Sequence, residues 1–170
     1  NKEFEEKRGD KIKEQWESLD IPDDEFFWYY SDIIAETVQY GGRTSFCNRI
    51  LNLGTQYSEM NLLIYNEKGK SDKHMYPSKV LQETKIDDEF KNNARQWTYQ
   101  YCSQLGYMQT LSKTEKYPPL KNKNMTLDFY YKYCKDIFGI ELKPRTMLWN
   151  ERYGADKPSI SKVIYMNGDE

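Results

Sequence analysis

Residues 95–110 have the sequence RQWTYQYCSQLGYMQT. The stretch is rich in aromatic and amide side chains, and a single cysteine, Cys102, lies in its middle. Its pattern is typical neither of a simple amphipathic helix nor of a surface loop. Tyrosine and tryptophan bury a large ring and keep one polar atom, so the stretch suits either an aromatic core around a disulfide or the wall of a substrate pocket. The composition alone leaves both alternatives open.

A second landmark lies in the last ten residues of the sequence. Residues 161–166, SKVIYM, are predicted to form a short strand, and the polar and acidic turn NGDE follows at 167–170. A strand that leads into such a turn is a common way for an α/β enzyme to present a catalytic residue. Together, the two landmarks favour an α/β fold with at least one strand near 161–166.

The composition limits the classes of protein to consider. With 170 residues, the chain fits one domain or parts of two. Its net charge of −2, with lysines scattered among acidic residues, predicts no nucleic-acid partner. No apolar run approaches the roughly 18 residues that a membrane span needs, and no signal peptide is evident. Because the chain starts within a charged helical pattern, we expect it to be a segment of a longer precursor.

The first 94 residues are predicted to be helical. Pro22 and the acidic run 23–25 are a helix-start signal for the clearest helix of the chain. Its apolar side chains recur every three or four residues over 26–38, and Gly41 and Gly42 are expected to end it. Shorter helices are expected at 46–53 and 57–64.

The later residues contain one more helix signal. Residues 126–138 are predicted to be helical, with Thr126 as N-cap and Gly139 just beyond the C-terminus. Residues 145–160 are expected to be irregular, and the strand at 161–166 follows them.

No catalytic constellation is complete in this sequence. There is no G-x-S-x-G nucleophile motif and no glycine-rich phosphate loop. The single histidine, His74, lies in a polar stretch and is interpreted as a solvated surface residue. The acidic runs 23–25 and 87–89 could bind a metal ion, but acidic first turns of helices are the better interpretation. We therefore predict neither a metal nor a cofactor.

Three cysteines are present, Cys47, Cys102 and Cys134, and their spacing fits no zinc site. One disulfide with one remaining thiol is compatible with an oxidising compartment. Asn124 begins an N-glycosylation sequon, Asn-Met-Thr. Together these features favour the secretory or lysosomal route.

Four motifs in the second half of the chain occur in a recognisable order. They are RQWTYQYCSQLGY at 95–107, YCKDIFG at 133–139, MLW with YG at 147–154, and VIYMNGDE at 163–170. They resemble, in turn, the R-x-W-x-Y-Q-x-C-T-E-x-G-Y/F signature, the C-x-D/x-x-F/W-G element, the W…Y-G-G element and the N-G-x-L-D-P-W turn of the prolylcarboxypeptidase family. This family of serine peptidases includes dipeptidyl-peptidase II and the thymus-specific serine protease, whose V-V-Q-Y is similar to VQY at 38–40.

The resemblance implies that this chain is a segment of an α/β-hydrolase. Residues 1–94 would belong to the helical cap inserted into the hydrolase, and residues 95–170 would return to the hydrolase domain and stop before the catalytic Asp and His. The nucleophilic Ser would precede this segment, and the triad Asp would directly follow Glu170. Asp169 occupies the variable position of the turn and is not the triad Asp. With no triad member present, the segment alone is expected to be inactive.

The resemblance also implies roles for the cysteines. Cys102 and Cys134 match two family cysteines that pair with each other. Cys47 matches a family cysteine whose partner is missing here, because no cysteine lies between Leu51 and Tyr101. Cys47 is therefore expected to be a buried thiol or to pair outside this segment.

Four substrate-binding residues are expected from the resemblance: Thr98, Gln100, Tyr107 and Trp149. Tyr107 would lie in the wall of a proline-preferring pocket, where its ring could stack on a pyrrolidine. Thr98 replaces the Asp that holds the substrate's amino terminus in dipeptidyl peptidases, which favours a carboxypeptidase-like activity. Gln104 replaces a usual Glu and changes one local hydrogen-bond network.

The predicted function is therefore that of a serine exopeptidase that cleaves next to proline, in a lysosomal, vacuolar or secreted setting. The expected partners are the remainder of its own precursor, proline-containing peptides and a second copy in a homodimer. One alternative is a catalytically inactive relative that serves as a binding or structural module. Another is a plain helical interaction domain whose resemblance to the family is fortuitous.

Overall fold

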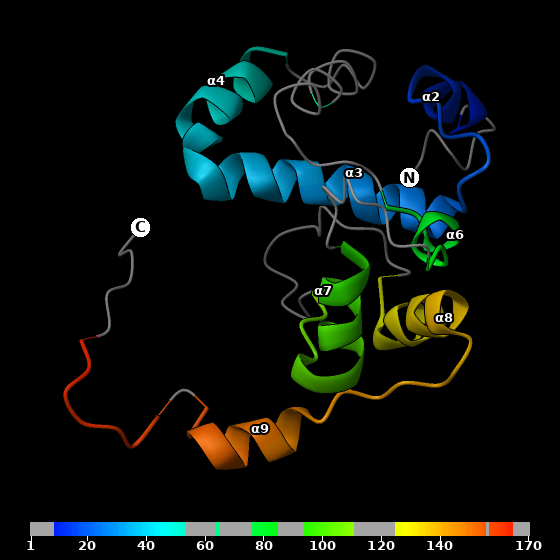
Figure 1. The fold of residues 1–170 in the computed structure, drawn as a ribbon. Coiled ribbons are helices and arrows are strands. Elements are labelled where there is room, and N and C mark those ends of the chain that lie inside the picture. The colour runs from blue at the N-terminus through cyan, green and yellow to red at the C-terminus, as the bar shows by residue number, and fades with distance from the viewer. Residues whose placement is uncertain are drawn as a thin grey trace.

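The computed structural model describes residues 9–53, 64, 76–84, 94–110, 125–155 and 157–164. The described part of the chain is built from helices and contains no strand (Figure 1). The helices are α2 (Gly9–Gln15), α3 (Asp23–Thr37), α4 (Arg43–Leu53), α6 (Ser78–Leu81), α7 (Ala94–Gln100), α8 (Leu127–Phe138) and α9 (Thr146–Tyr153). Wider π-helical segments follow α3, at Val38–Gly42, and α7, at Tyr101–Leu105.

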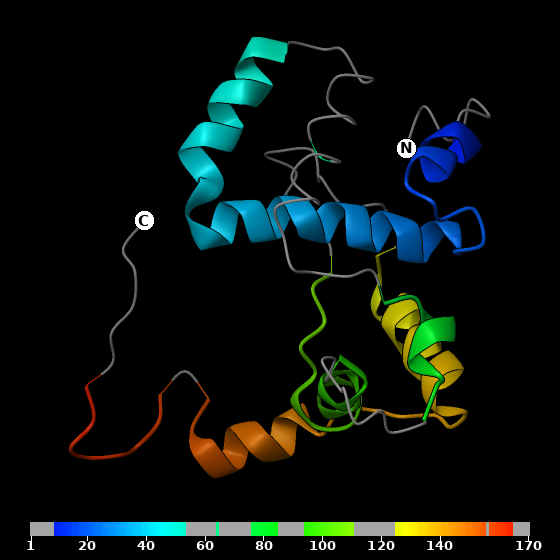
Figure 2. The same ribbon diagram turned by 45° about the horizontal axis from the view of Figure 1, so that its top comes forward.

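Helix α3 lies at the centre of this arrangement. Both views show α2 and α4 on one side of α3 and helices α7, α8 and α9 on the other (Figures 1 and 2). Pro22 directly precedes the helix, and three acidic residues fill its first turn, where the positive end of the helix dipole favours them. Helix α3 thus begins where Pro22 and the acidic run 23–25 predict a helix start.

The first core lies between α2, α3 and α4. Its buried residues are Trp16, Ile21, Phe26, Tyr29, Ile33, Phe46 and Ile64. The Trp16 ring contacts Phe26 and Tyr29 edge to face, with centroids 5.7 and 6.3 Å apart. Edge-to-face pairs of this kind add to the free energy gained by burying the rings. The predicted apolar face of α3 is therefore confirmed at Phe26 and Ile33.

The glycines after α3 end it, as predicted. Gly41 has φ +90°, a conformation that residues with a Cβ rarely adopt. The chain bends at this kink, and α4 leaves α3 at a steep angle (Figure 2). Cys47 of α4 is an exposed thiol, which contradicts the first of its two expected states, a buried thiol, while pairing outside this segment stays a prediction.

The second core joins α6, α7 and α8. Its buried residues are Leu81, Tyr101, Cys102, Tyr133, Cys134 and Ile137. A disulfide connects Cys102 to Cys134, with Cα atoms 5.9 Å apart across 32 residues of sequence. Arg95 strengthens the same contact, since its guanidinium donates to the Leu81 carbonyl and lies 4.7 Å from the centre of the Phe138 ring.

Helix α8 has the predicted termini. The Thr126 hydroxyl accepts a hydrogen bond from the Phe129 N–H at 3.3 Å, and Gly139 follows the helix with φ +70°. Tyr130, Tyr133, Cys134 and Ile137 are buried, as their helical spacing requires.

Two expectations for the C-terminal part meet a different result. Residues 146–153 form α9, where irregular structure was predicted. Its large apolar residues Met147 and Leu148 are exposed, so the sequence has no apolar stripe that would mark a buried helix face.

Residues 161–164 are not in a strand, and 165–166 lie outside the described residues, so the predicted strand is not confirmed. A strand needs a neighbour to pair its backbone groups, and the described residues provide none.

The disulfide provides a stability test. Replacing Cys102 and Cys134 together with Ser should lower the free energy of unfolding by about 3–4 kcal/mol, because the denatured chain regains the freedom of the closed loop. Urea denaturation would measure the change. Cys47→Ser is the matched control and should have little effect, because this thiol is exposed and unbonded. Equal stabilities for the double variant and the control would contradict the prediction.

Candidate functional site

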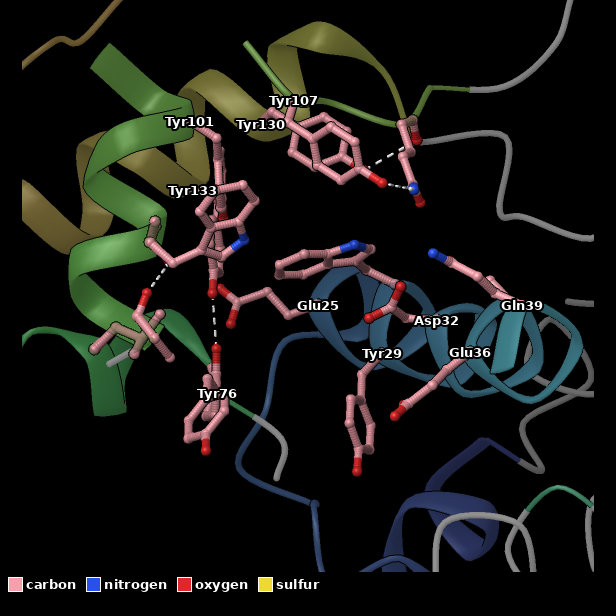
Figure 3. Close-up of a pocket in the computed structure, with 18 of the residues that line it drawn as sticks. Glu25, Tyr29, Asp32, Glu36, Gln39, Tyr76, Tyr101, Tyr107, Tyr130 and Tyr133 are labelled. Atoms are coloured by element: carbon pink, nitrogen blue, oxygen red, sulfur yellow. Dashed lines mark hydrogen bonds between the residues drawn. The ribbon is translucent and has the colours of Figure 1, made fainter. Parts of the chain in front are cut away.

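A cavity of about 730 Å³ lies between α3, the segment from α7 to Gln109, and α8 (Figure 3). This volume is within the range of small-ligand and substrate sites. Nine of the described residues that line it are aromatic: Trp28, Tyr29, Tyr40, Tyr76, Trp97, Tyr101, Tyr107, Tyr130 and Tyr133. The pocket is therefore formed where the predicted aromatic stretch meets a helix from the first half of the chain.

Two of the four predicted substrate-binding residues, Thr98 and Tyr107, line this pocket. Thr98 is buried in its wall, and the hydroxyl donates to the Ala94 carbonyl at 2.7 Å. Tyr107 is more than half exposed and lies at the open side, with its ring centroid 6.0 Å from that of Trp97. Its hydroxyl accepts a hydrogen bond from the Gln109 amide at 3.0 Å, which holds the ring in place.

The other two predicted residues lie elsewhere. Gln100 is exposed and is not among the described residues that line the pocket. It lies two residues after Thr98 on α7, and side chains two residues apart on a helix point in nearly opposite directions. Trp149 belongs to α9, where its ring stacks on Tyr153 with centroids 5.2 Å apart. The predicted glycosylation site, Asn124, lies outside the described residues.

The sequence interpretation missed the contribution of α3 to the pocket. Glu25, Asp32 and Glu36 line it and are the only charged side chains among its described lining residues. From the sequence, Glu25 was predicted only as part of the acidic first turn of the helix, and no role was predicted for Asp32 or Glu36. A signal was present nevertheless, because the three acids share one side of α3 with Trp28 and Tyr29.

Glu25 has a defined structural role at the inner end of the pocket. It is 6% exposed and accepts hydrogen bonds from the Ser78 N–H at 2.8 Å and the Ser78 hydroxyl at 2.6 Å. The carboxylate thereby binds the N-terminus of α6, where free backbone N–H groups favour an anion. This contact attaches α6 to α3.

The tyrosine hydroxyls of the pocket differ in their hydrogen bonding. Tyr133 donates to the Tyr76 carbonyl at 2.7 Å, and Tyr130 donates to the Gln109 carbonyl at 3.0 Å. The Tyr101 hydroxyl is buried and has no hydrogen-bond partner. The nearby Thr98 hydroxyl lowers the pKa of Tyr101, against the larger increase that burial causes.

Burial and negative charge keep these phenols protonated. Burial, followed by the charges of Glu36 and Asp32, raises the pKa of Tyr29 to about 12. Burial also raises the pKa of Tyr101, Tyr130 and Tyr133 well above the ordinary value. At neutral pH the pocket therefore offers hydroxyl donors, aromatic faces and carboxylates.

These groups suit binding more than bond cleavage. No group of three or more His, Cys, Asp or Glu side chains in the described part of the chain could hold a metal ion. The acids at 23–25 form the first turn of α3, as predicted, and the run 87–89 and His74 lie outside the described residues.

Of the described helices, none has both the length and the apolar character required to cross a membrane.

Comparison with known proteins identifies the class. The family model of serine carboxypeptidase S28 matches residues 3–170, so the chain belongs to this family of serine peptidases, for which an α/β-hydrolase fold is expected. One relative, "Probable serine protease EDA2" of Arabidopsis thaliana, is 25% identical over 163 residues, which cover 89% of this chain and 31% of the relative.

A second relative is the "Probable extracellular serine carboxypeptidase" of Arthroderma benhamiae. It is 30% identical over 82 residues, which cover 48% of this chain and 11% of the relative. The chain thus corresponds to less than a third of the length of either relative. No solved structure matches the chain.

The contact between Glu25 and Ser78 can be tested by substitution. Glu25→Ala should lower the free energy of unfolding by about 1–3 kcal/mol, because two buried donors of Ser78 lose their acceptor. Thermal or urea denaturation would measure this loss. Glu14→Gln, which alters an exposed acid of α2, is the control and should change stability little. If both variants were as stable as the parent, the contact would contribute nothing to the fold.

Proposed function

We propose that this chain is part of a serine exopeptidase that hydrolyses peptides next to proline, and that the pocket forms part of its substrate site. The observation that carries the proposal is the pocket itself, in a chain of the S28 family. Its lining combines α3, from the proposed cap region 1–94, with residues 97–109 of the proposed hydrolase region 95–170. A site between an inserted cap and a catalytic domain is a common location for substrate binding.

In this proposal the catalytic triad lies outside residues 1–170. A serine oxygen attacks the scissile carbonyl, a histidine takes the serine proton and passes it to the leaving amine, and an aspartate orients the histidine. Water then hydrolyses the acyl-enzyme. Backbone amides stabilise the oxyanion that forms in each step. The residues of this chain bind and orient the peptide, and residues 1–170 alone are proposed to be inactive.

Proline preference is proposed to arise at the open side of the pocket. The rings of Trp97 and Tyr107 are tilted by 54° to each other with centroids 6.0 Å apart, and both are about half exposed. A pyrrolidine ring is flat and apolar enough to pack between such faces. Thr98 carries no charge to hold a peptide's amino terminus, which supports a carboxypeptidase-like activity. Gln100 and Trp149 contribute to substrate binding in this proposal only if other parts of the precursor lie against them.

We propose that the full-length protein enters the secretory route and is either secreted or delivered to a lysosome or vacuole. The disulfide between Cys102 and Cys134 suits an oxidising compartment. The name of the Arthroderma relative includes the word extracellular, which is consistent with this setting. We also propose that Asn124, which begins an N-glycosylation sequon, is glycosylated, and that the protein forms a homodimer.

Activity of the full-length protein tests the proposed class. Incubation with peptides of the form acetyl-Ala-Pro-Phe should release phenylalanine, and a serine-reactive fluorophosphonate should label the protein and stop the release. If neither labelling nor release occurred, the protein would instead be an inactive relative that binds without cleaving.

The pocket wall has its own prediction. In the full-length enzyme, Tyr107→Ala should lower kcat/KM for acetyl-Ala-Pro-Phe by about tenfold, because one aromatic face is lost. The matched substrate acetyl-Ala-Ala-Phe should be affected much less. An equal loss on both substrates, together with a lower melting temperature, would indicate a folding defect and not a lost proline contact.

A further inference from the structure

The hydroxyl of Tyr101 carries an inference that rests on the proposed function and names a main-chain contact of the substrate. Tyr101 directly follows α7, lines the pocket and is only 5% exposed. Among the described residues, its hydroxyl has no hydrogen-bond partner. Buried hydroxyls are nearly always paired, because an unpaired one lowers stability. The exception therefore calls for an acceptor from outside the described residues.

Other buried hydroxyls of the pocket are already engaged. Those of Tyr130 and Tyr133 donate to backbone carbonyls at 3.0 and 2.7 Å (Figure 3). The Thr98 hydroxyl donates to the Ala94 carbonyl at 2.7 Å. After burial, the nearby Tyr101 phenol is the next cause of the raised pKa of both Tyr130 and Tyr133. Tyr101 thus adds to this group of tyrosines a donor that no described carbonyl accepts.

Trp97 places this donor beside the proposed proline site. Its ring contacts Tyr101 edge to face, with centroids 6.1 Å apart, and the Trp97 and Tyr107 centroids are 6.0 Å apart. A proline ring held between Trp97 and Tyr107 therefore lies next to the residue with the unpaired hydroxyl. The hydroxyl itself is covered, and Trp97, which is 45% exposed, can turn aside with little loss of packing. We expect the Trp97 ring to shift when a peptide enters.

The chemistry of proline limits which group the hydroxyl can meet. Proline has no backbone N–H, so a site that binds it through the main chain must donate hydrogen bonds. Two carbonyls flank the proline ring: its own, which is the scissile one in a carboxypeptidase-like reaction, and that of the preceding residue. The scissile carbonyl belongs in the oxyanion hole, which leaves the other for Tyr101. Burial raises the pKa of Tyr101 well above its ordinary value, so the phenol keeps its proton and can donate.

We infer that Tyr101 donates a hydrogen bond to the carbonyl of the residue that precedes the proline of the substrate. This contact fixes the main chain of the peptide, while the rings of Trp97 and Tyr107 hold the proline. Because every peptide has this carbonyl, the contact positions the substrate whatever side chain precedes the proline.

The test uses the full-length enzyme and two substrates that differ in one amide group. The first is acetyl-Ala-Pro-Phe. In the second, a trans carbon–carbon double bond replaces the Ala–Pro amide, which keeps the shape but removes the carbonyl. Kinetics of phenylalanine release should give a kcat/KM for the amide peptide about threefold to tenfold above that for the alkene peptide, as expected for one hydrogen bond.

Tyr101→Phe removes the donor and keeps the ring. In this variant kcat/KM for the amide peptide should fall by about threefold to tenfold, and the values for the two peptides should then agree within about twofold. Its melting temperature should stay equal or rise, because an unpaired buried hydroxyl is removed.

Tyr133→Phe is the matched control, because it deletes the same hydroxyl from a neighbouring buried tyrosine. The Tyr133 hydroxyl donates to the Tyr76 carbonyl, so this variant should have a lower melting temperature than the parent. Any change in its kcat/KM should be the same factor for both peptides, so the ratio between them should stay as in the parent enzyme.

The outcomes separate this inference from the proposed function. Equal kcat/KM for the two peptides with the parent enzyme would overturn the inference and leave the peptidase proposal standing. A ratio that survives Tyr101→Phe would also overturn it, since another donor would then bind the carbonyl. If Tyr101→Phe lowered the melting temperature as much as Tyr133→Phe, the hydroxyl would have a partner within the protein and the assignment would be wrong. Cleavage of neither peptide would overturn the proposed function and the inference with it.

Discussion

The edge-to-face contact of Trp28 with Tyr133, at a centroid distance of 4.9 Å, is the interaction on which the described structure depends. It joins α3, whose other face packs into the first core, to the disulfide-linked second core. Glu25 reinforces the junction through Ser78, 53 residues away in the sequence. Beyond this contact, Asp32 and Glu36 of α3 line the same cavity as the segment after α7. The pocket thus exists because α3 contacts the second core at one end.

The pocket contains one group that does not favour folding by itself. The Tyr101 hydroxyl is buried without a hydrogen-bond partner among the described residues. Removing a polar group from water without a hydrogen bond lowers stability. Proteins keep such arrangements mainly at functional sites, where binding a ligand recovers the lost interactions. The surrounding disulfide and the satisfied hydroxyls of Tyr130 and Tyr133 supply the rigidity that holds this group in place.

The helices that could be predicted are those with strong local signals. Helix α8 has an apolar stripe, an N-cap at Thr126 and a glycine at its end, and all three appear as predicted. Helix α9 was missed because Met147 and Leu148 are exposed, so no stripe marks it. The pairing of Cys102 with Cys134 was expected from the family resemblance, since spacing alone leaves the partners of three cysteines open.

By itself, the sequence determined the membership of the family, the main helices of both halves and the aromatic stretch that lines the pocket. Only the tertiary structure decided which side chains meet there. It placed Thr98 and Tyr107 in the pocket without Gln100 or Trp149, and it added Asp32 and Glu36 from α3. The physical reason is that helical periodicity reveals the apolar face of a helix. Whether its polar face meets water or another element depends on contacts between residues far apart in the sequence.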